Sequence, residues 1–326
     1  MKRSLAFAAA ALALISAFVF LNNSALLSSP GTGQPHVLAH RGLAQTFGTD
    51  DLKSDTCTAE RMHAPEHPFL ENTLASMQRA YELGADMVEL DVHPTADGQF
   101  AVFHDWTVDC RTNGKGVTRE HGLAALKALD IGYGYTADGG KTFPFRGKGV
   151  GLLPSLDEVL AAFPGKRLLI HIKSNDRGEG ELLARRLGAL APEHLGRLSV
   201  YGGERPVDVI RQRLPQIAAM HARGLKQCLM RYVALGWSGY VPSACTRTIV
   251  LMPLNYAHWM WGWPDRFLER MRGVSSEVFV IGPWHGGEFS TGIDDVRQLE
   301  ALPERYSGGI WTNRIDRIAS ALAAQR

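Results

Sequence analysis

The sequence predicts an α/β protein, a βα barrel that follows an apolar amino-terminal segment. From residue 36 onward, short β-branched or apolar runs alternate with longer helical patterns, which is the rhythm of a βα barrel or of an open α/β sheet. Polar side chains fall at or just after the carboxyl ends of several of these runs, as in barrels, whereas an open sheet gathers them at one switch point. Residues 36–326 are therefore expected to form one barrel domain.

The composition is that of a globular protein and excludes one class of partner. Of the 326 residues 45% are hydrophobic, and the 34 glycines and 16 prolines are ordinary numbers, so the chain can bury a sizeable core. Its 35 basic and 33 acidic residues leave a formal net charge of +2, too little to attract a polyanion. The sequence therefore predicts no nucleic-acid partner.

The amino terminus has the pattern of a membrane-targeting segment and is left out of the fold. Lys2 and Arg3 precede an almost uninterrupted apolar run from residue 5 to residue 21. The run is long for the core of a signal peptide, and residues 22–27 offer no clean small-x-small cleavage site. Residues 1–35 are thus expected to be a signal peptide or an uncleaved anchor, followed by a linker. In both cases the body is delivered outside the inner membrane, as a periplasmic protein or anchored facing the periplasm.

The alternating patterns give a set of expected elements. Strands are expected at residues 36–39, 87–92, 100–104, 167–173, 198–201, 216–220, 248–252, 277–281 and 309–312. Helices are expected at residues 73–83, 155–162, 180–190, 206–214, 265–271, 294–299 and 316–324. The stretch from residue 43 to residue 70 is long and polar, and loops of that length are usually functional lids or disordered. The chain lacks the G-x-G-x-x-G, G-x-x-x-x-G-K and G-x-S-x-G motifs, which excludes the usual dinucleotide, P-loop and serine-hydrolase sites.

Four cysteines, an even number, occur in a chain that is expected to be exported, where disulfides can form. Three pairings are open on paper. The favoured pairing joins Cys57 to Cys110 and Cys228 to Cys245, with the second pair bracketing a short loop-like stretch. Four free, buried thiols are the alternative. Because no C-x-x-C spacing is present, none of the four is expected to bind a metal.

Two carboxylates and a histidine are the first candidates for chemistry. Residues two apart in a strand project to the same face, so Glu89 and Asp91 can present two carboxylates to one hard cation. The pair Asp97-Gly98 between apolar runs predicts a hairpin that brings His104 back beside Asp91. A titratable imidazole would then lie next to the ion. The alternative for the two acids is a solvated strand face.

Two further groups of residues stand where a barrel builds its site. The first strand ends in His40 and Arg41, which are a proton carrier near neutral pH and a fixed fork of donors suited to phosphate. Glu71, Asn72 and Thr73 stand at a helix start, where Asn or Thr caps the helix and free amide groups favour an anion. A structural ion pair and simple capping are the respective alternatives.

Four short motifs follow the order HR, EN, ExD, HD of the glycerophosphodiester phosphodiesterase family, which the chain closely resembles: His40-Arg41, Glu71-Asn72-Thr73, Glu89-x-Asp91 and His104-Asp105. The resemblance covers residues 36–173 and resumes at Ile310-Trp311-Thr312, and no motif is found between residues 195 and 305. It implies a TIM-type (β/α)8 barrel of the phospholipase C-like phosphodiesterase superfamily. It also implies cleavage of a phosphodiester to sn-glycerol 3-phosphate and an alcohol, with one divalent ion.

The resemblance further implies roles for single residues. His40 and His104 would be the acid–base pair. Phosphate or substrate would be held by Arg41, Asn72 and Trp311, and the metal by Glu89, Asp91 and, more weakly, Glu71. In this family type a neighbouring hydroxyl of the substrate's glycerol attacks phosphorus, and water then opens the cyclic phosphate. An anionic diester repels a nucleophile, and a cation and an arginine neutralise its charge. One base and one acid move the protons that the attack requires.

One position departs from the family pattern. The family's usual third metal ligand is the Glu of an E-x-K segment, and here His171 takes its place while Lys173 keeps the lysine. If His171 ligates, a site of two carboxylates and one imidazole favours Zn, Mn or Fe over the Mg or Ca that the resemblance implies. The alternatives are a passive His171 and a metal that is displaced or absent. Lys173 is expected to contact a phosphate oxygen or a ligating carboxylate.

An aromatic cluster in residues 256–263 consists of Tyr256, His258, Trp259, Trp261 and Trp263. It is expected to form a lip for a lipid-like leaving group or a membrane contact, and ordinary packing is the alternative. The predicted function is an exported phosphodiesterase acting on glycerophosphodiesters. The alternatives are a lysophospholipase D-like enzyme acting on lysolipids at the membrane and a non-catalytic polyol-phosphate-binding barrel.

Overall fold

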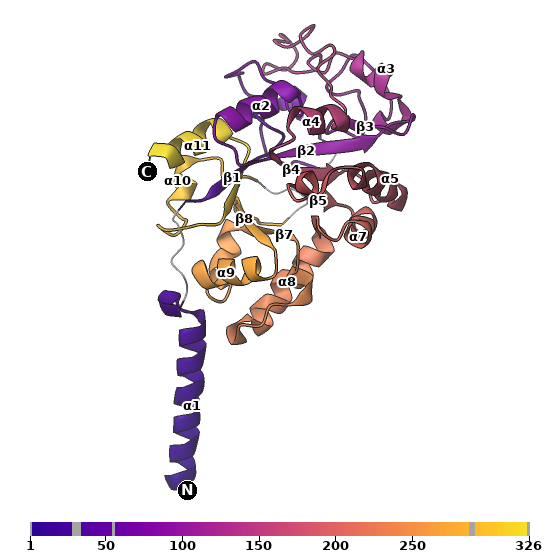
Figure 1. The fold of residues 1–326 in the computed structure, drawn as a ribbon. Coiled ribbons are helices and arrows are strands. Elements are labelled where there is room, and N and C mark those ends of the chain that lie inside the picture. The colour runs from indigo at the N-terminus through magenta and orange to yellow at the C-terminus, as the bar shows by residue number, and fades with distance from the viewer. Residues whose placement is uncertain (1, 28–33, 54–55, 287–290, 325–326) are drawn as a thin grey trace.

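Figure 1 shows the chain as a computed structural model, which describes residues 2–27, 34–53, 56–286 and 291–324. The strands are β1 (His36–Ala39), β2 (Met87–Pro94), β3 (Phe100–Val102), β4 (Arg167–Ile172), β5 (Leu198–Gly202), β6 (Ala218–His221), β7 (Ile249–Pro253), β8 (Glu277–Ile281) and β9 (Gly309–Thr312). The helices are α1 (Lys2–Asn23), α2 (Leu74–Glu82), α3 (Leu123–Lys127), α4 (Leu156–Ala162), α5 (Arg177–Gly188), α6 (Pro192–Leu195), α7 (Glu204–Arg213), α8 (Ala222–Leu235), α9 (Asp265–Gly273), α10 (Val296–Leu299) and α11 (Ile315–Ala324). Two 3-10 turns used below are η4 (Gly236–Ser238) and η6 (Leu254–Trp259).

The strands form a nearly closed barrel. Within the described residues, eight parallel strands follow the order β6-β5-β4-β2-β1-β9-β8-β7, and β3 pairs with β2 in the antiparallel sense. At the two ends of that order, the hydroxyl of Thr248 donates to the carbonyl of Ala219 at 3.0 Å and so links the start of β7 to β6. Helices lie around the outside of the sheet (Figure 1). The expected (β/α)8 barrel is confirmed.

The expected strands are all present, and their ends fall within two residues of the expected ones. The seven expected helices are present as well, but α8 was not predicted. This helix buries Cys228 and Tyr232 and exposes Met230 and Val233, so apolar residues occupy both faces and obscure the helical period. The expectation of a loop between Cys228 and Cys245 is therefore wrong, because Cys228 lies inside α8.

Side chains on the strands alternate between the helix layer and the barrel interior. In β2, Val88 and Leu90 belong to the large apolar cluster that packs the strands against the helices. Met87 belongs to a separate inner cluster, together with side chains of β1, β4, β6, β7, β8 and β9. Glu89 and Asp91 share the face of Met87, so the strand directs both carboxylates toward the interior, above an apolar layer.

Residues 43–70 and 103–155 pack together as a small lobe, here called the insertion lobe. Ala59, Met62 and Leu70 of the first segment share an apolar cluster with Phe103 and Leu126 of the second. A disulfide between Cys57 and Cys110, with Cα atoms 5.6 Å apart, joins the two segments. The described part of residues 43–70 is therefore ordered, which contradicts the alternative of a disordered segment, and the alternative of a functional lid stays a prediction.

Both expected disulfide pairings are confirmed. Cys57 bonds to Cys110, and Cys228 of α8 bonds to Cys245, with Cα atoms 4.8 Å apart. No cysteine is free in the described residues. The second bond ties α8 to the turn that precedes β7.

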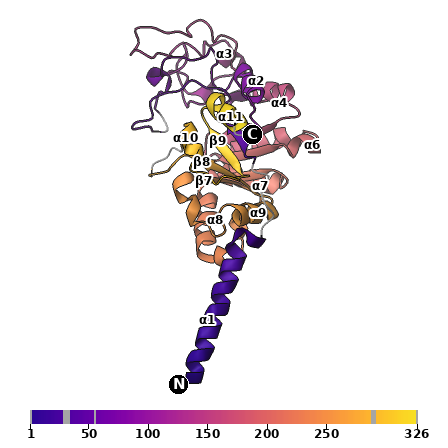
Figure 2. The same ribbon diagram turned by 90° about the vertical axis from the view of Figure 1, so that its left-hand side faces the viewer.

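Helix α1 stands apart from the barrel. In Figures 1 and 2 it projects from the end of the body where α8 and α9 lie, opposite the insertion lobe. Residues Arg3–Asn23 have a mean hydropathy of 2.4, and none of this segment is buried. By length and composition this helix can cross a membrane, and a signal peptide would have the same properties.

An ion-pair group ties three strands together at their amino ends. Arg167 opens β4, Glu277 opens β8 and His36 opens β1. Arg167 Nη1 donates to Glu277 Oε1 at 3.0 Å, and His36 Nε2 lies 2.8 Å from the same oxygen. Burial alone would raise the pKa of Glu277, but the contacts with His36 and Arg167 outweigh it and lower the pKa to about 2.

Because the pKa of Glu277 is lower in the folded than in the unfolded chain, its contacts stabilise the fold above pH 4.5, and this contribution is lost as the pH falls toward 2. We expect Glu277→Gln to lower the free energy of unfolding at neutral pH by roughly 2–3 kcal/mol. This loss of unfolding free energy should become smaller as the pH falls from 4.5 toward 2. Urea unfolding of the full chain in detergent, from pH 7 downward, measures it. Exposed Glu304→Gln is the control, and a wild-type pH profile for Glu277→Gln would contradict the expectation.

Candidate active site

Strand β1 directs His40 into the barrel mouth, on the same face as the interior residue Leu38. Its Nδ1 lies 2.6 Å from Asn313 Oδ1, and Arg41 Nε donates to its Nε2 at 3.2 Å. Both contacts fit a neutral imidazole with the proton on Nδ1. Burial, and then the charge of Arg41, lowers the pKa of His40 well below its usual range. The ring is tilted against Trp311 of β9, with centroids 5.0 Å apart.

The chain turns sharply after β1. Arg41 and Asn72 both have φ near +59°, a left-handed conformation that side-chain-bearing residues adopt only where the surroundings enforce it. The amide of Asn72 donates to the carbonyl of Arg41 at 3.0 Å and joins the two strained residues. Between them, Gly42 has φ +80°, and a Cβ there would lie 2.6 Å from Ser76 Oγ, so glycine is required.

The start of α2 divides the expected roles between two residues. Thr73 is the N-cap and forms a capping box with Ser76. Asn72 instead binds Asp91 with both ends of its amide: Nδ2 donates to Asp91 Oδ2 at 3.0 Å, and Oδ1 accepts from the Asp91 amide at 3.1 Å. Simple capping therefore describes Thr73, while Asn72 holds Asp91 in place.

The expected hairpin is confirmed and brings His104 to the site. Strands β2 and β3 are antiparallel, and the amide of Phe103 donates to the carbonyl of Asp91 at 3.0 Å. His104 is the next residue, so it lies beside Asp91. Burial lowers the pKa of His104, and Arg41 adds to the shift.

Glu89 and Asp91 of β2 and His171 of β4 are, in the described part of the chain, the group of His and acidic side chains that could hold a metal ion. One ligand atom from each lies within 4.8 Å of the others. Asp91 pairs with His171 in the strand register, and His171 Nδ1 lies 2.8 Å from Asp91 Oδ1 and 3.9 Å from Glu89 Oε1. Two carboxylates and one imidazole can hold one divalent ion, and the imidazole favours a transition metal over the Mg or Ca that the family resemblance implies.

Burial and nearby charges set the protonation of this group. Burial alone would raise the pKa of Asp91, but positive charges, Lys173 first, lower it well below its usual range. Burial raises the pKa of Glu89, and the charge of Asp91 adds to the shift. Burial and then Lys173 lower the pKa of His171 to about 4, so the imidazole is neutral and has a lone pair for a ligand bond. Lys173 Nζ lies 3.4 Å from Asp91 Oδ1.

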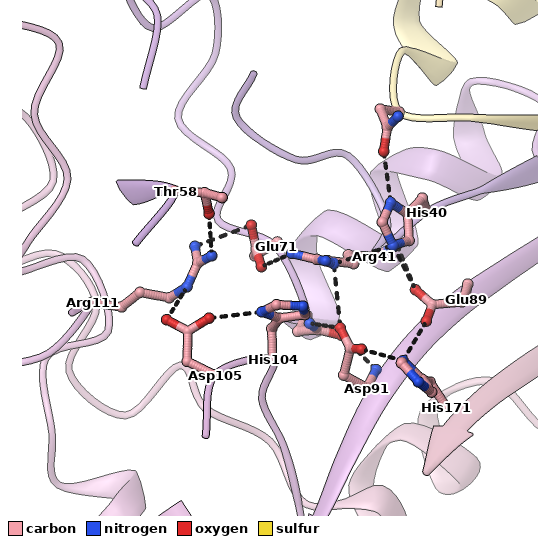
Figure 3. A network of polar contacts seen from close by, with 12 residues as sticks. His40, Arg41, Thr58, Glu71, Glu89, Asp91, His104, Asp105, Arg111 and His171 are labelled. Carbon is pink, nitrogen blue, oxygen red and sulfur yellow. Dashed lines mark hydrogen bonds and ion pairs between the residues drawn. The ribbon is translucent and has the colours of Figure 1, made fainter. Parts of the chain in front are cut away.

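Figure 3 shows a second polar network, which joins the insertion lobe to His104. Arg111 is 2% exposed, and its Nε donates to Asp105 Oδ2 at 2.8 Å. The other oxygen of Asp105 lies 2.7 Å from His104 Nδ1. Arg111 also donates to the hydroxyl of Thr58. Burial alone would raise the pKa of Asp105, but Arg111 and His104 lower it, so an ionised carboxylate faces His104.

Glu71 lies outside the three-residue metal group. Its Oε1 accepts from Arg41 Nη1 at 2.9 Å, and its Oε2 lies 3.1 Å from Arg111 Nη1. The carboxylate therefore neutralises two buried guanidinium groups. The geometry gives no support to the weaker assignment of Glu71 as a metal ligand.

Residues that the sequence analysis missed complete the site. Tyr201 of β5 donates to Glu89 Oε1 at 2.7 Å and stacks on His171, with ring centroids 4.1 Å apart. Tyr201 is the last residue of the expected strand 198–201. A polar residue at the carboxyl end of a strand was the feature by which the sequence could have indicated it as a site residue. Asn313 follows Trp311 by two positions and so shares its face. No sequence feature indicated Arg111 as a site residue, because it reaches the site only through the folding of the insertion lobe.

Trp311, expected to touch substrate, lies inside the barrel next to His40. Its indole Nε1 is buried and has no hydrogen-bond partner among the described residues. A buried donor without a partner is costly unless a ligand or water accepts from it.

The expected aromatic cluster divides into an inner and an outer part. Trp263 packs against Phe267 and Tyr306, with ring centroids 5.9 and 5.6 Å away. The other members are exposed on the surface: Tyr256, His258, Trp259 and Trp261. Packing therefore explains Trp263, whereas the outer residues stay exposed. Between ring centroids, Tyr256 lies 6.2 Å from Trp284, and His258 lies 5.5 Å from Trp259.

Comparison with known proteins connects this geometry to a family. Residues 40–186 match the glycerophosphoryl diester phosphodiesterase family, and this stretch contains all four motifs and the group Glu89, Asp91 and His171. Comparison thus identifies residues 40–186 as a stretch of the glycerophosphoryl diester phosphodiesterase type. The matched stretch also contains the segment from His171 to Lys173, where the sequence departs from the E-x-K pattern.

Named relatives match this chain over part of their length. A glycerophosphodiester phosphodiesterase of Caldanaerobacter subterraneus subsp. tengcongensis is 43% identical over 103 residues, 32% of this chain and 39% of the relative. One from Bacillus subtilis is 37% identical over 115 residues, 34% of this chain and 36% of the relative. The human lysophospholipase D GDPD1 is 34% identical over 116 residues, 33% of each chain. The chain thus spans well under half the length of these relatives.

Solved structures share the fold over the whole barrel. A glycerophosphodiester phosphodiesterase from Agrobacterium tumefaciens has a TM-score of 0.56 at 22% identity, covering 88% of this chain and 100% of its own. A phosphodiesterase from Oleispira antarctica, solved in complex with the product sn-glycerol-3-phosphate, has a TM-score of 0.56 at 20% identity, covering 89% and 97%. At these identities the likeness shows the barrel fold of the family.

Arg111→Met should destabilise the fold strongly, because Asp105 and Glu71 would lose a buried counter-charge. Breaking a buried ion pair on one side costs about 3–5 kcal/mol. Urea unfolding of the full chain in detergent measures the change. Arg79→Met, which removes a half-exposed ion pair with Glu82, is the matched control and should cost about 0.5 kcal/mol or less. Equal losses of unfolding free energy in Arg111→Met and Arg79→Met would contradict the role of Arg111 as the buried counter-charge of Asp105 and Glu71.

Proposed function

We propose that the chain hydrolyses glycerophosphodiesters to sn-glycerol 3-phosphate and an alcohol. The proposal is carried by one observation: His40, His104 and the group Glu89, Asp91 and His171 meet in one buried polar cluster in the barrel (Figure 3). An anionic diester needs its charge neutralised and protons moved on two sides of phosphorus. The family match of residues 40–186 and the product named for the Oleispira antarctica structure support this substrate class.

We propose that Glu89, Asp91 and His171 hold one divalent ion. When bound, such an ion supplies positive charge to the phosphate oxygens. Burial raises the pKa of Glu89, and a cation bound between Glu89 and Asp91 would stabilise the ionised form of both carboxylates. The family resemblance implies Mg or Ca, whereas the imidazole favours Zn, Mn or Fe.

His40 and His104 are proposed as base and acid because their partners differ. His40 Nδ1 faces the amide oxygen of Asn313, which holds a proton on Nδ1 and keeps the lone pair on Nε2. Arg41 Nε donates to that Nε2 in this structure, and a substrate proton would be accepted there. His104 Nδ1 faces the carboxylate of Asp105, which stabilises the protonated ring against the burial and the Arg41 charge that lower its pKa. Each imidazole is therefore oriented by the group that suits its proposed role.

The remaining polar side chains would bind the phosphate and its glycerol. Arg41 and Lys173 place two positive charges beside Asp91, and a phosphate between them would be neutralised from two directions. Asn72 fixes the carboxylate that both cations contact. Trp311 offers a buried indole donor without a partner among the described residues, which an oxygen of the substrate would satisfy.

His40→Ala and His104→Ala should each reduce turnover at least 100-fold, because general acid–base catalysis contributes roughly that much or more. Alcohol release from glycerophosphocholine by metal-loaded full chain measures the rate, and circular dichroism checks the fold. His194→Ala, a half-buried histidine on α6 without an assigned role, should keep wild-type activity. Near-wild-type turnover in either active-site variant would refute the assignment.

The same assay separates the alternatives. Release from lysophosphatidylcholine in preference to glycerophosphocholine would identify a lysophospholipase D-like enzyme. Binding of glycerol 3-phosphate without turnover of any diester would identify a polyol-phosphate-binding barrel.

His171→Glu should move metal preference toward Mg and Ca, because a third carboxylate replaces the imidazole. We expect the affinity for Mg relative to Zn to rise at least 10-fold, measured by calorimetric titration of the full chain. His194→Glu adds a carboxylate away from the site and should leave the ratio unchanged. The same ratio in His171→Glu and wild type would mean that His171 is no ligand.

We also propose that the barrel body acts outside the inner membrane. The apolar helix α1 supports export, as do two disulfides, which form and persist in oxidising compartments. A bilayer contact through the amino-terminal segment and the exposed members of the aromatic cluster fits the same location.

A further inference from the structure

We propose that α1 is retained as a membrane anchor and that one face of α8 rests on the bilayer that α1 crosses. This face, called the α8 face, consists of Met230, Val233, Ala234 and Trp237. The inference rests on the export proposed above and is independent of the catalytic assignment.

The carboxyl end of α1 is bound to the barrel body. Asn22 and Asn23 donate from their side-chain amides to the carbonyl of Trp237, at 3.2 and 2.8 Å. Arg270 of α9 donates to the carbonyl of Asn22 at 2.8 Å and to Asn23 Oδ1 at 3.0 Å. Cleavage beyond Asn23 would take these partners from Trp237 and Arg270. The contacts therefore fit an anchor that stays attached.

The length of α1 sets the height of this joint above the bilayer. Arg3–Asn23 contains 21 residues, which at 1.5 Å each span about 31 Å, close to the thickness of a hydrocarbon core. A helix that crosses the core therefore emerges at Asn22 and Asn23. Because Trp237 is hydrogen-bonded to both residues, it must lie in the interface of the same bilayer.

The α8 face is apolar, and its side chains are exposed. Met230, Val233 and Ala234 follow the i, i+3, i+4 spacing of one stripe of α8, and Trp237 follows in η4. Met230 is 63% exposed and Trp237 is 39% exposed, whereas Tyr232 on the other face is buried. A helix that is apolar on both faces needs a second apolar environment.

The surroundings of the α8 face have the composition of a membrane interface. Trp261 is exposed and donates from its indole to the carbonyl of Val233 at 2.8 Å, which places it against α8. Tyr240, just after η4, is exposed as well. Trp and Tyr are enriched where a membrane meets water, and Arg231 beside Met230 suits anionic headgroups.

Continuity with α1 favours a bilayer over a second copy of the chain. The apolar side chains of α1 are exposed along its length and meet the α8 face at the joint between Asn22 and Trp237. Figures 1 and 2 place α8 at the end of the body from which α1 projects. One bilayer covers both surfaces, whereas a second copy on α8 alone leaves α1 in water.

Quenching of tryptophan emission by brominated lipid tests the inference. The full chain is reconstituted into vesicles of phosphatidylcholine and phosphatidylglycerol, with and without bromine on the acyl chains. We expect Trp237→Phe to reduce the quenched part of the emission by at least a third. Trp106→Phe is the matched control: Trp106 is exposed to a similar extent but lies in the insertion lobe, so quenching should stay as in the wild type.

Three results would overturn the inference. The first is that the quenched part of the emission is the same in Trp237→Phe and in the wild type. If Trp237→Phe does not fold, Trp261→Phe provides the same measurement. Another is a protein recovered from cells whose chain begins after residue 23. The third is a dimer of the protein in the vesicles in which the α8 face is shielded from lipid. The substitution Val233→Arg would dissociate such a dimer. None of these measurements depends on turnover, so failure of the proposed enzyme activity would be seen separately.

Discussion

Burial of four carboxylates in and around one end of the barrel is the constraint on which the rest of the site depends. Glu71, Glu89, Asp91 and Asp105 are removed from water, and an ionised carboxylate tolerates this only with counter-charges and hydrogen bonds. Arg41 and Arg111 share Glu71 between them, and Asn72, His171 and Lys173 surround Asp91. The left-handed backbone at Arg41 and Asn72 is a local strain that these contacts offset.

The site is assembled from two cores. The barrel strands supply His40, Glu89, Asp91 and His171, each on the inward face that the strand register defines. The insertion lobe supplies Arg111, which orients Asp105 and through it His104. The relative position of the two imidazoles therefore depends on how the lobe packs against the barrel, and not on the strands alone.

Local periodicity was enough to predict the strands and the direction of the paired acids. Strand ends were found to within two residues, and the inward direction of Glu89 and Asp91 came from the two-residue repeat. The features that were missed depend on partners distant in the chain. Arg111 reaches Glu71 across 40 positions only because the lobe folds, and α8 was hidden because both its faces are apolar. The sequence predicts Glu71 as a weaker metal ligand because it does not show that the guanidinium groups of Arg41 and Arg111 both contact this carboxylate.

The Cys57–Cys110 bond has a consequence beyond holding a loop. Its cysteines immediately precede Thr58 and Arg111, whose side chains are hydrogen-bonded behind His104. Closing a loop of 53 residues restricts the unfolded chain by roughly 4 kcal/mol. A chain that has not yet been oxidised therefore lacks the covalent link that supports the contact of Asp105 with His104, so this contact depends on the redox state of the compartment in which the chain folds.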